Sequence, residues 1–275
     1  MEFDKIILMS FEEDMPNGDI TTIATVSADA IAEGDFKAKD DGVVCGIEIA
    51  RRSFELSGGG VEFTAHFHDG DFVKKGDVIA HVKGNARSIL MGERTALNLM
   101  QRASGIATAT RKAVLAIEGF STRITDTRKT MPGLRLLDKY AVRIGGAVNH
   151  RFGLSDGILI KDNHIAAAGS ITNAVKKAKA YAPHTLKIEV ETENMQQVAE
   201  AIEAGADIIM LDNMNCDEMK AAVAFIGGRA VTEASGNMGE RDLAEVAKTG
   251  VDLISIGALT HSVKALDISL KFKLI

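Results

Sequence analysis

The sequence predicts a two-part α/β protein, in which a small antiparallel sheet domain precedes an irregular or incomplete parallel α/β barrel. Two observations lead to this fold class. Short strand-like segments separated by turn signals fill residues 36–84, whereas strand and helix patterns alternate after about residue 108. We therefore place the domain boundary after residue 107, which gives domains of residues 1–107 and 108–275.

In the first domain, strand candidates cover residues 36–49, 61–67 and 72–82, and clusters of Gly and Asp mark the turns between them. Residues 86–103 then place apolar side chains at helical spacing. This pattern predicts a helix that leads out of the small sheet domain.

In the second domain we count six clear strands, which favours an incomplete barrel over a regular eightfold one. An open doubly wound sheet is the structural alternative, although the GxGxxG turn expected after its first strand is not found. The predicted strands are 122–126, 157–160, 185–190, 207–211, 229–232 and 252–256, and the predicted helices include 171–181, 195–204, 217–225 and 241–249.

Composition limits the possible functions. The 275 residues are 46% hydrophobic and 25% charged, with a net charge of -6, as in a soluble globular protein. An acidic surface does not attract nucleic acid by bulk electrostatics, so any anionic ligand requires a local basic cluster. Cys45 and Cys216 have no metal-type spacing and fit two reduced thiols in the cytoplasm. No basic leader and no apolar run of membrane-spanning length is found, so we expect neither export nor insertion.

The carboxyl ends of the predicted barrel strands carry charged residues or glycines. Reacting groups of barrels come from these ends because the loops there vary without disturbing the packed interior. Any one such residue is more often a solvated loop charge, but a whole rim of charges is best explained by ligands that complete the pairing. The rim consists of Arg128, Lys129, Lys161, Glu191, Asp212, Glu233, Ser235, Gly236 and Gly257.

Two features of this rim suggest the ligand. His150 and Arg151 follow a glycine pair, and with Arg128 and Lys161 they form a cationic cluster that fits a small ligand with more than one carboxylate. Gly236 and Gly257 follow the last two predicted strands, where glycines are typical of a phosphate-binding site, although either could be an ordinary turn glycine.

Two other candidates are weaker. His66 and His68 are spaced to share one face of a strand, but a third metal ligand is not nearby in the sequence. Residues 58–60 lack the Lys-Ser/Thr that follows a phosphate loop.

Taken with the rim residues above, the sequence resembles the quinolinate phosphoribosyltransferases over nearly the whole chain. The number and order of the matching segments make the resemblance specific. Met131, Ala147 and Asn237 depart from the family pattern, and Asn237 stands where a second glycine is common. The matching segments are residues 13–14, 18–22, 93–95, 104–108, 126–130 (DTRKT), 132–133, 149–151 (NHR), 159–164 (LIKDNH), 189–191 (EVE), 211–213 (LDN), 233–236 (EASG) and 257–262 (GALTHS).

The resemblance implies an N-terminal open α/β sandwich, a seven-stranded type of incomplete barrel, and last residues that can pack back on the first domain. It implies decarboxylating phosphoribosyl transfer from phosphoribosyl pyrophosphate to quinolinate in NAD biosynthesis. It also implies a homodimer, with a hexamer left open, in which Arg94 acts in the partner's site.

The resemblance further implies roles for individual residues. Magnesium is expected to enter with the substrate, with Glu191 and Asp212 as candidate ligands. Lys129, Glu191 and Asp212 are the expected catalytic residues. Quinolinate would be bound by Arg94, Arg128, His150, Arg151 and Lys161, and the phosphoribosyl group by Lys129, Glu191, Asp212, Ser235, Gly236 and Gly257.

Two other functions remain open at this stage. A Schiff-base lyase would use Lys161 in a mainly apolar pocket, which the neighbouring basic residues argue against. A ligand-binding paralogue of the same fold would be expected to have lost charged rim residues, and here the whole set is present.

Overall fold

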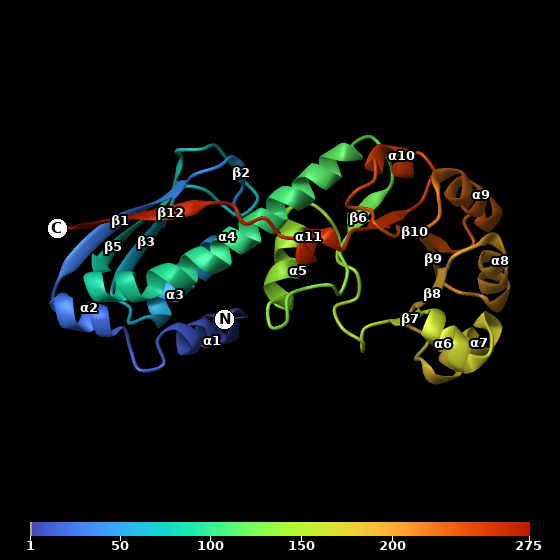
Figure 1. Ribbon diagram of the computed structural model, residues 1–275, viewed down its shortest axis with the longest axis horizontal. Coiled ribbons are helices and arrows are strands. Elements are labelled where there is room, and N and C mark those ends of the chain that lie inside the picture. Colours follow the sequence, from blue (N-terminus) through green and yellow to red (C-terminus); the bar gives the residue numbers. More distant parts are fainter. Residues whose placement is uncertain (1) are drawn as a thin grey trace. The chain divides into compact units, whose positions relative to one another are not determined.

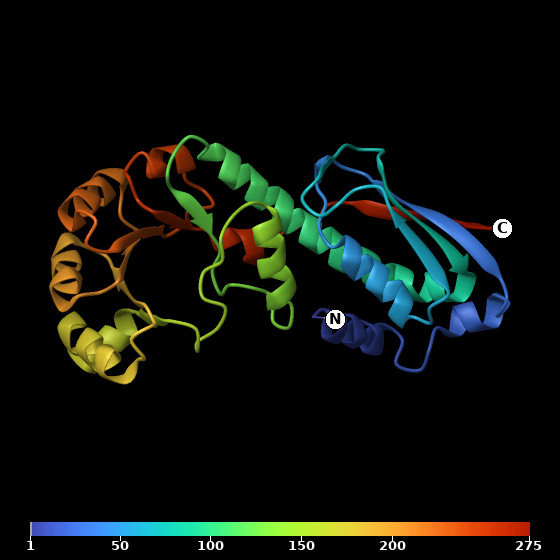
Figure 2. The ribbon, with the colours of Figure 1, turned by 180° about the vertical axis from the view of Figure 1, so that it is seen from behind.

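The computed structural model describes residues 2–275, which divide into two compact units. Unit 1 consists of residues 2–111, 131–146 and 262–275, and unit 2 consists of residues 112–130 and 147–261. Figures 1 and 2 show the ribbon from opposite sides. Among the residues described, no helix is both long and apolar enough to span a membrane.

Unit 1 contains a four-stranded antiparallel sheet. Its strands are ordered β12-β1-β5-β3, so the C-terminal strand pairs with the first strand of the chain. The bounds are β1 (Ile31–Ala38), β3 (Val61–Ala65), β5 (Val78–Asn85) and β12 (Ile268–Leu274), and a separate pair joins β2 (Gly42–Val43) to β4 (Phe72–Val73).

Helices α3 (Ile47–Leu56) and α4 (Ala86–Ala116) contribute apolar side chains to the core of unit 1. Phe36 of β1 contacts the rings of both Phe54 and Phe63, which joins sheet and helix through aromatic packing. The remaining helices of unit 1 are α1 (Asp4–Asp14), α2 (Ile20–Thr25) and α5 (Arg135–Ile144).

The predicted strand 36–49 is wrong at its C-terminal end, because the chain turns into α3 at Ile47. Gly46 adopts a left-handed conformation with φ of +102°, which reverses the chain direction. The carboxylate of Asp69 then accepts hydrogen bonds from the backbone N–H groups of Gly46 and Ile47. A cap supplied from more than twenty residues away leaves no signal in the local sequence pattern.

Unit 2 is built on a six-stranded parallel sheet ordered β6-β11-β10-β9-β8-β7, which confirms the predicted alternation of strands and helices. A single parallel bridge between Thr125 and Val148 adds a seventh extended segment beside β6. The strands are β6 (Arg123–Thr125), β7 (Ile158–Ile160), β8 (Ile188–Thr192), β9 (Ile208–Asp212), β10 (Val231–Ser235) and β11 (Leu253–Ser255).

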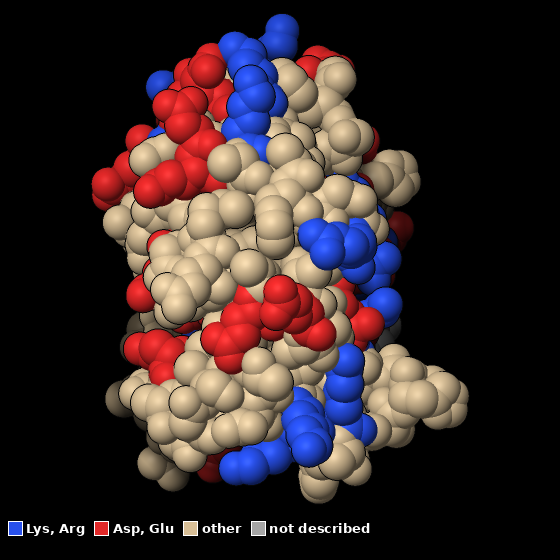
Figure 3. Space-filling model, turned by 90° about the vertical axis from the view of Figure 1, so that its right-hand side faces the viewer, with Lys and Arg blue, Asp and Glu red and all other residues tan. Residues whose placement is uncertain are grey.

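Helices line the outer side of this curved sheet (Figures 1 and 2). Over the outer face seen in Figure 3, basic side chains are interspersed with acidic ones. The helices of unit 2 are α6 (Asp162–Ala168), α7 (Ile171–Tyr181), α8 (Met195–Ala204), α9 (Cys216–Ile226), α10 (Leu243–Ala247) and α11 (Ala258–His261).

Candidate active site

A cavity of about 410 Å³ lies at the carboxyl ends of the parallel strands in unit 2. Successive side chains of a strand point to opposite faces, so residues two apart reach the same cavity. Its lining is Thr127, Arg128, Lys129, His150, Arg151, Leu159, Lys161, Glu191, Met210, Asp212, Glu233, Ser235 and Ser255.

Two guanidinium groups make the cavity cationic. The buried Nε of Arg128 has no hydrogen-bond partner among residues 2–275. Arg151 donates from Nη1 to the carbonyl oxygen of Gly157 at 2.8 Å. Burial and the nearby charge of Arg128 lower the pKa of Arg151. Like charges held this close favour an anionic ligand that can neutralise both.

Lys161 and Glu191 form an ion pair beside these arginines, with Nζ donating to Oε2. The side chain of Lys161 is 45% exposed, whereas that of Glu191 is 15% exposed. A Schiff-base lysine requires an apolar pocket, whereas Lys161 is paired with a carboxylate in a cavity lined by further charged side chains. The geometry therefore argues against the lyase alternative.

Asp212, the last residue of β9, is oriented by the residue that follows it. Asn213 has a φ of +56° and donates from Nδ2 to Asp212 Oδ2 at 2.7 Å. Its backbone N–H donates to the carbonyl oxygen of Ser235 at 3.1 Å. At Gly236, which has a φ of +94°, a Cβ would lie 2.3 Å from Asn213 Oδ1. Glycine is therefore required beside Asp212 for steric as well as conformational reasons.

The second rim glycine packs against the Lys129 segment. A Cβ at Gly257 would lie 3.0 Å from Lys129 Cδ and 3.2 Å from the ring of His261. Thr260 Oγ1 donates to the backbone carbonyl of Lys129 at 2.9 Å. The family departure at Asn237 also has a structural correlate, because this residue adopts a φ of +51°, where glycine is favoured.

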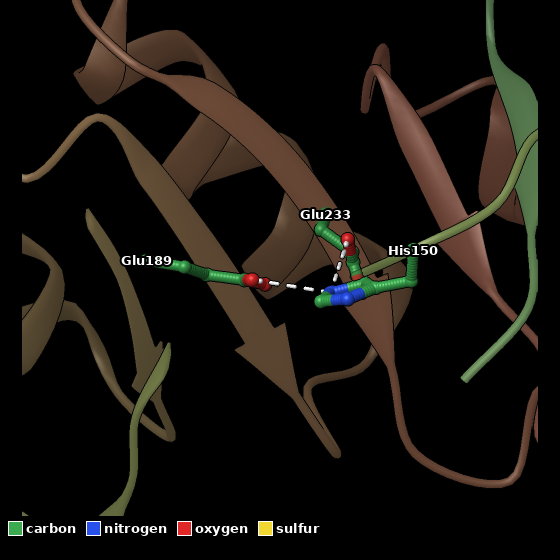
Figure 4. A group of neighbouring side chains, drawn as sticks. All are labelled: His150, Glu189 and Glu233. Atoms are coloured by element: carbon green, nitrogen blue, oxygen red, sulfur yellow. Dashed lines mark ion pairs between the residues drawn. The ribbon is translucent and has the colours of Figure 1, made fainter. Parts of the chain in front are cut away.

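A layer of buried acids lies next to the cavity, and one of them, Glu233, contributes to its lining. Asp126, Glu189 and Glu233 are 0%, 4% and 1% exposed. Asp126 accepts hydrogen bonds from the backbone N–H of His150 at 2.8 Å and from Asn149 Nδ2 at 2.6 Å. The carboxylates of Glu189 and Glu233 lie beside the His150 imidazole (Figure 4). These three acids fix the segment that carries His150.

Comparison with known proteins identifies the family. The model of the quinolinate phosphoribosyl transferase N-terminal domain matches residues 19–104, and that of the C-terminal domain matches residues 106–271. The chain belongs to the quinolinate phosphoribosyl transferase family.

Individual relatives in this family match over nearly the full chain. A probable nicotinate-nucleotide pyrophosphorylase (carboxylating) from Bacillus subtilis is 48% identical, with 98% of this chain and 93% of the relative covered. The crystal structure of NadC from Streptococcus pyogenes is 41% identical with a TM-score of 0.93, covering 100% of this chain and 97% of that one. The nicotinate-nucleotide pyrophosphorylase from Ehrlichia chaffeensis is 40% identical with a TM-score of 0.95, covering 99% of each chain. The fold class predicted from the sequence and the family resemblance are both confirmed.

Most of the site residues expected for the quinolinate phosphoribosyl transferase family line this one cavity. Gly236 and Gly257 border it through their packing against Asn213 and Lys129. Arg94 lies elsewhere, exposed on α4 of unit 1. The predicted residues among the lining are Arg128, Lys129, His150, Arg151, Lys161, Glu191, Asp212 and Ser235.

Sequence reasoning did not single out Glu189, assigned no role to Glu233, and did not recognise that Asn213 orients Asp212. A signal for the two glutamates was present, because Glu189 is two residues before Glu191 and Glu233 is two residues before Ser235. In strands, residues two apart share a face. Because the sequence prediction of the rim used residues at or near each strand end, it included Glu233 but missed Glu189.

Glu233 should make stability depend on pH. Burial and the charge of Glu189 raise the pKa of Glu233 to about 7. Such a carboxyl binds a proton on folding, so wild-type stability should fall as pH rises from about 4.5 to 7, with a slope approaching about 1.4 kcal/mol per pH unit. The neutral Glu233→Gln variant should lack this component of the slope.

Thermal unfolding of both proteins across this pH range measures the difference. The control is Glu203→Gln, which removes an exposed glutamate from α8 and should follow the wild-type pH profile. Parallel profiles for the wild type and Glu233→Gln would show that Glu233 titrates as it does in water.

Proposed function

We propose that this chain catalyses the decarboxylating transfer of a phosphoribosyl group from phosphoribosyl pyrophosphate to quinolinate, giving nicotinate mononucleotide, pyrophosphate and carbon dioxide in NAD biosynthesis. The observation that carries this proposal is the cavity at the carboxyl ends of the strands of unit 2, in which Arg128 and Arg151 share the space with Glu191 and Asp212. The two guanidinium groups can pair with a dicarboxylate, and the two carboxylates can stabilise positive charge that develops on the ribose.

The reaction proceeds by two bond exchanges. The ring nitrogen of quinolinate bonds to C1 of the ribose as the bond from C1 to pyrophosphate breaks. The ribosylated ring then accepts the electron pair released when its C2 carboxylate leaves as carbon dioxide, and a proton takes the vacant position at C2. Positive charge develops on the ribose in the first exchange, so fixed carboxylates beside it lower the barrier.

The residue roles follow from this chemistry. Arg128 and Arg151, with His150 and Lys161, form the quinolinate side of the cavity, and Arg94 completes it from another subunit. On the phosphoribosyl side, Lys129 pairs with phosphate oxygens while Glu191 and Asp212 act on the ribose. Ser235, Gly236 and Gly257 leave the space and backbone that a phosphate requires.

Magnesium is the proposed cofactor. Glu191 and Asp212 offer the oxygen ligands it prefers, and the hydrogen bonds from Lys161 and Asn213 use only Oε2 and Oδ2 of these carboxylates. When bound with the substrate, magnesium would neutralise charge on the departing pyrophosphate.

The direct test is a coupled assay with purified protein, quinolinate, phosphoribosyl pyrophosphate and Mg²⁺, following carbon dioxide and nicotinate mononucleotide. Release of both products, dependent on both substrates and abolished by chelation, is expected. Absence of carbon dioxide release in folded protein would contradict the proposed function.

The proposed assembly is a homodimer in which Arg94 enters the partner's cavity. Mixing Arg94→Ala with Arg128→Ala protein should then restore activity, because a mixed dimer contains one site with both arginines intact. Equal mixing of freely exchanging subunits should restore about a quarter of wild-type activity. Activity is measured after subunit exchange has been demonstrated with labelled protein. No recovery after exchange would place Arg94 outside the partner's site.

A cytoplasmic location is also part of the proposal. It is supported by the free thiols of Cys45 and Cys216, which fit a reducing compartment.

A further inference from the structure

The cluster of His150, Glu189 and Glu233 goes beyond the roles proposed so far. His150 Nε2 lies 3.1 Å from Glu189 Oε2 and 3.6 Å from Glu233 Oε2, and both glutamates point at the imidazole edge (Figure 4). The other oxygen of each glutamate is buried and has no hydrogen-bond partner among residues 2–275. Two buried acids with so few partners are costly to fold, which indicates a functional reason for them.

The hydrogen bonds determine which ring nitrogen of His150 carries the proton. The backbone N–H of Arg151 lies 2.8 Å from His150 Nδ1 and can only donate, so Nδ1 accepts and carries no hydrogen. The ring proton is therefore on Nε2, within hydrogen-bond distance of Glu189. Both nitrogens are consequently used within the protein.

This tautomer also decides between two uses of the cluster. Two glutamates and a histidine whose ligand atoms lie within 4.8 Å of one another could hold a divalent cation. A metal at Nε2 requires that nitrogen to be unprotonated, with the proton on Nδ1. The Arg151 N–H occupies the position that such a proton would need. The geometry therefore favours orientation of the imidazole over metal binding.

We propose that Glu189 and Glu233 are positioning residues that hold His150 in its Nε2–H tautomer, so that its ring borders the substrate without donating to it. Pairing with the substrate carboxylates is then left to Arg128 and Arg151. Asp126 also holds the same segment by accepting a hydrogen bond from the backbone N–H of His150. The charge of Glu189 also acts on Arg151, so the acids balance the guanidinium pair as well.

The neighbouring groups are consistent with this arrangement. Burial and the charges of Glu189 and Asp126 raise the pKa of Glu233. A neutral imidazole placed between two acids needs to donate only one proton, which the closer Glu189 accepts. Glu233, at 3.6 Å, limits the rotation of the ring.

The decisive measurement is a proton–nitrogen correlation spectrum of protein labelled in its histidine rings, with His150 assigned from the His150→Asn variant. The wild type should show His150 protonated at Nε2 and unprotonated at Nδ1. A proton on Nδ1, in either the other tautomer or the imidazolium form, would overturn the inference. The spectrum is recorded without turnover, so its result does not depend on whether the proposed function is correct.

Two variants separate positioning from simple structural support. Glu189→Leu removes the acceptor and should give mixed tautomers, with the KM for quinolinate raised by about tenfold and that for phosphoribosyl pyrophosphate changed far less. Glu189→Gln keeps an acceptor oxygen, so it should retain the wild-type tautomer and a KM for quinolinate close to the wild-type value. The exposed Glu203→Gln serves as the control. A wild-type His150 spectrum in Glu189→Leu would overturn the assignment of Glu189.

Discussion

Turnover of quinolinate should exceed that of nicotinate by about 10⁴-fold or more in kcat/KM. The reason is the half-buried guanidinium pair, because the buried Nε of Arg128 has no hydrogen-bond partner among residues 2–275 and Arg151 beside it has a lowered pKa. A dicarboxylate pairs with both cations, whereas a monocarboxylate leaves one unpaired. A site whose buried polar groups lose a partner rejects a substrate far more strongly than one that only loses contact area.

The variant Arg151→Met tests the origin of this selectivity. It keeps much of the apolar length of the side chain but removes the charge, so it should reduce kcat/KM for quinolinate much more than for nicotinate. The matched control is Arg143→Met, at an exposed position on α5 of unit 1, which should preserve the ratio. Equal use of both acids by the wild type would contradict the dicarboxylate assignment.

The site was largely predictable because the carboxyl ends of parallel strands converge on one edge. Placing Arg128, Lys161 and Asp212 together required only that the βα alternation be recognised, since geometry then brings residues distant in sequence to one rim. Errors of two or three residues in the strand bounds did not change which residues lie at the rim. The predicted strand 229–232 is observed as Val231–Ser235, and Ser235 still lies at its end.

The parts that sequence did not predict depend on contacts between distant residues. Asp69 caps α3, and β12 pairs with β1 across more than two hundred residues, so neither interaction is visible in a local window. The tautomer of His150 depends on a backbone N–H and two acids from separate strands. Residue type alone indicated a titratable group there but could not show that both nitrogens were already engaged.

Removing the charge at Asp212 should lower kcat while leaving the ground-state affinity for quinolinate nearly intact. Asp212 lies at the end of β9 with its carboxylate held by Asn213, so its charge is already in place when positive charge develops on the ribose. An interaction that strengthens only in the transition state changes kcat rather than binding. Asp212→Ala and Glu191→Ala should both follow this pattern, although Glu191→Ala also frees Lys161 from its ion pair.

The cleaner variant is Asp212→Asn, which keeps the shape of the side chain and should reduce kcat by roughly 10²-fold or more. Steady-state kinetics give kcat, and direct titration gives the Kd of quinolinate, which should change by less than about threefold. Asp217→Asn is the control, because it neutralises an exposed aspartate five residues further along the chain. A fall in affinity as large as the fall in kcat would show that Asp212 stabilises bound substrate, and unchanged turnover would remove it from the mechanism. A large fall in kcat with a nearly unchanged Kd would show that the preoriented carboxylate of Asp212 acts on the charge that develops as pyrophosphate leaves.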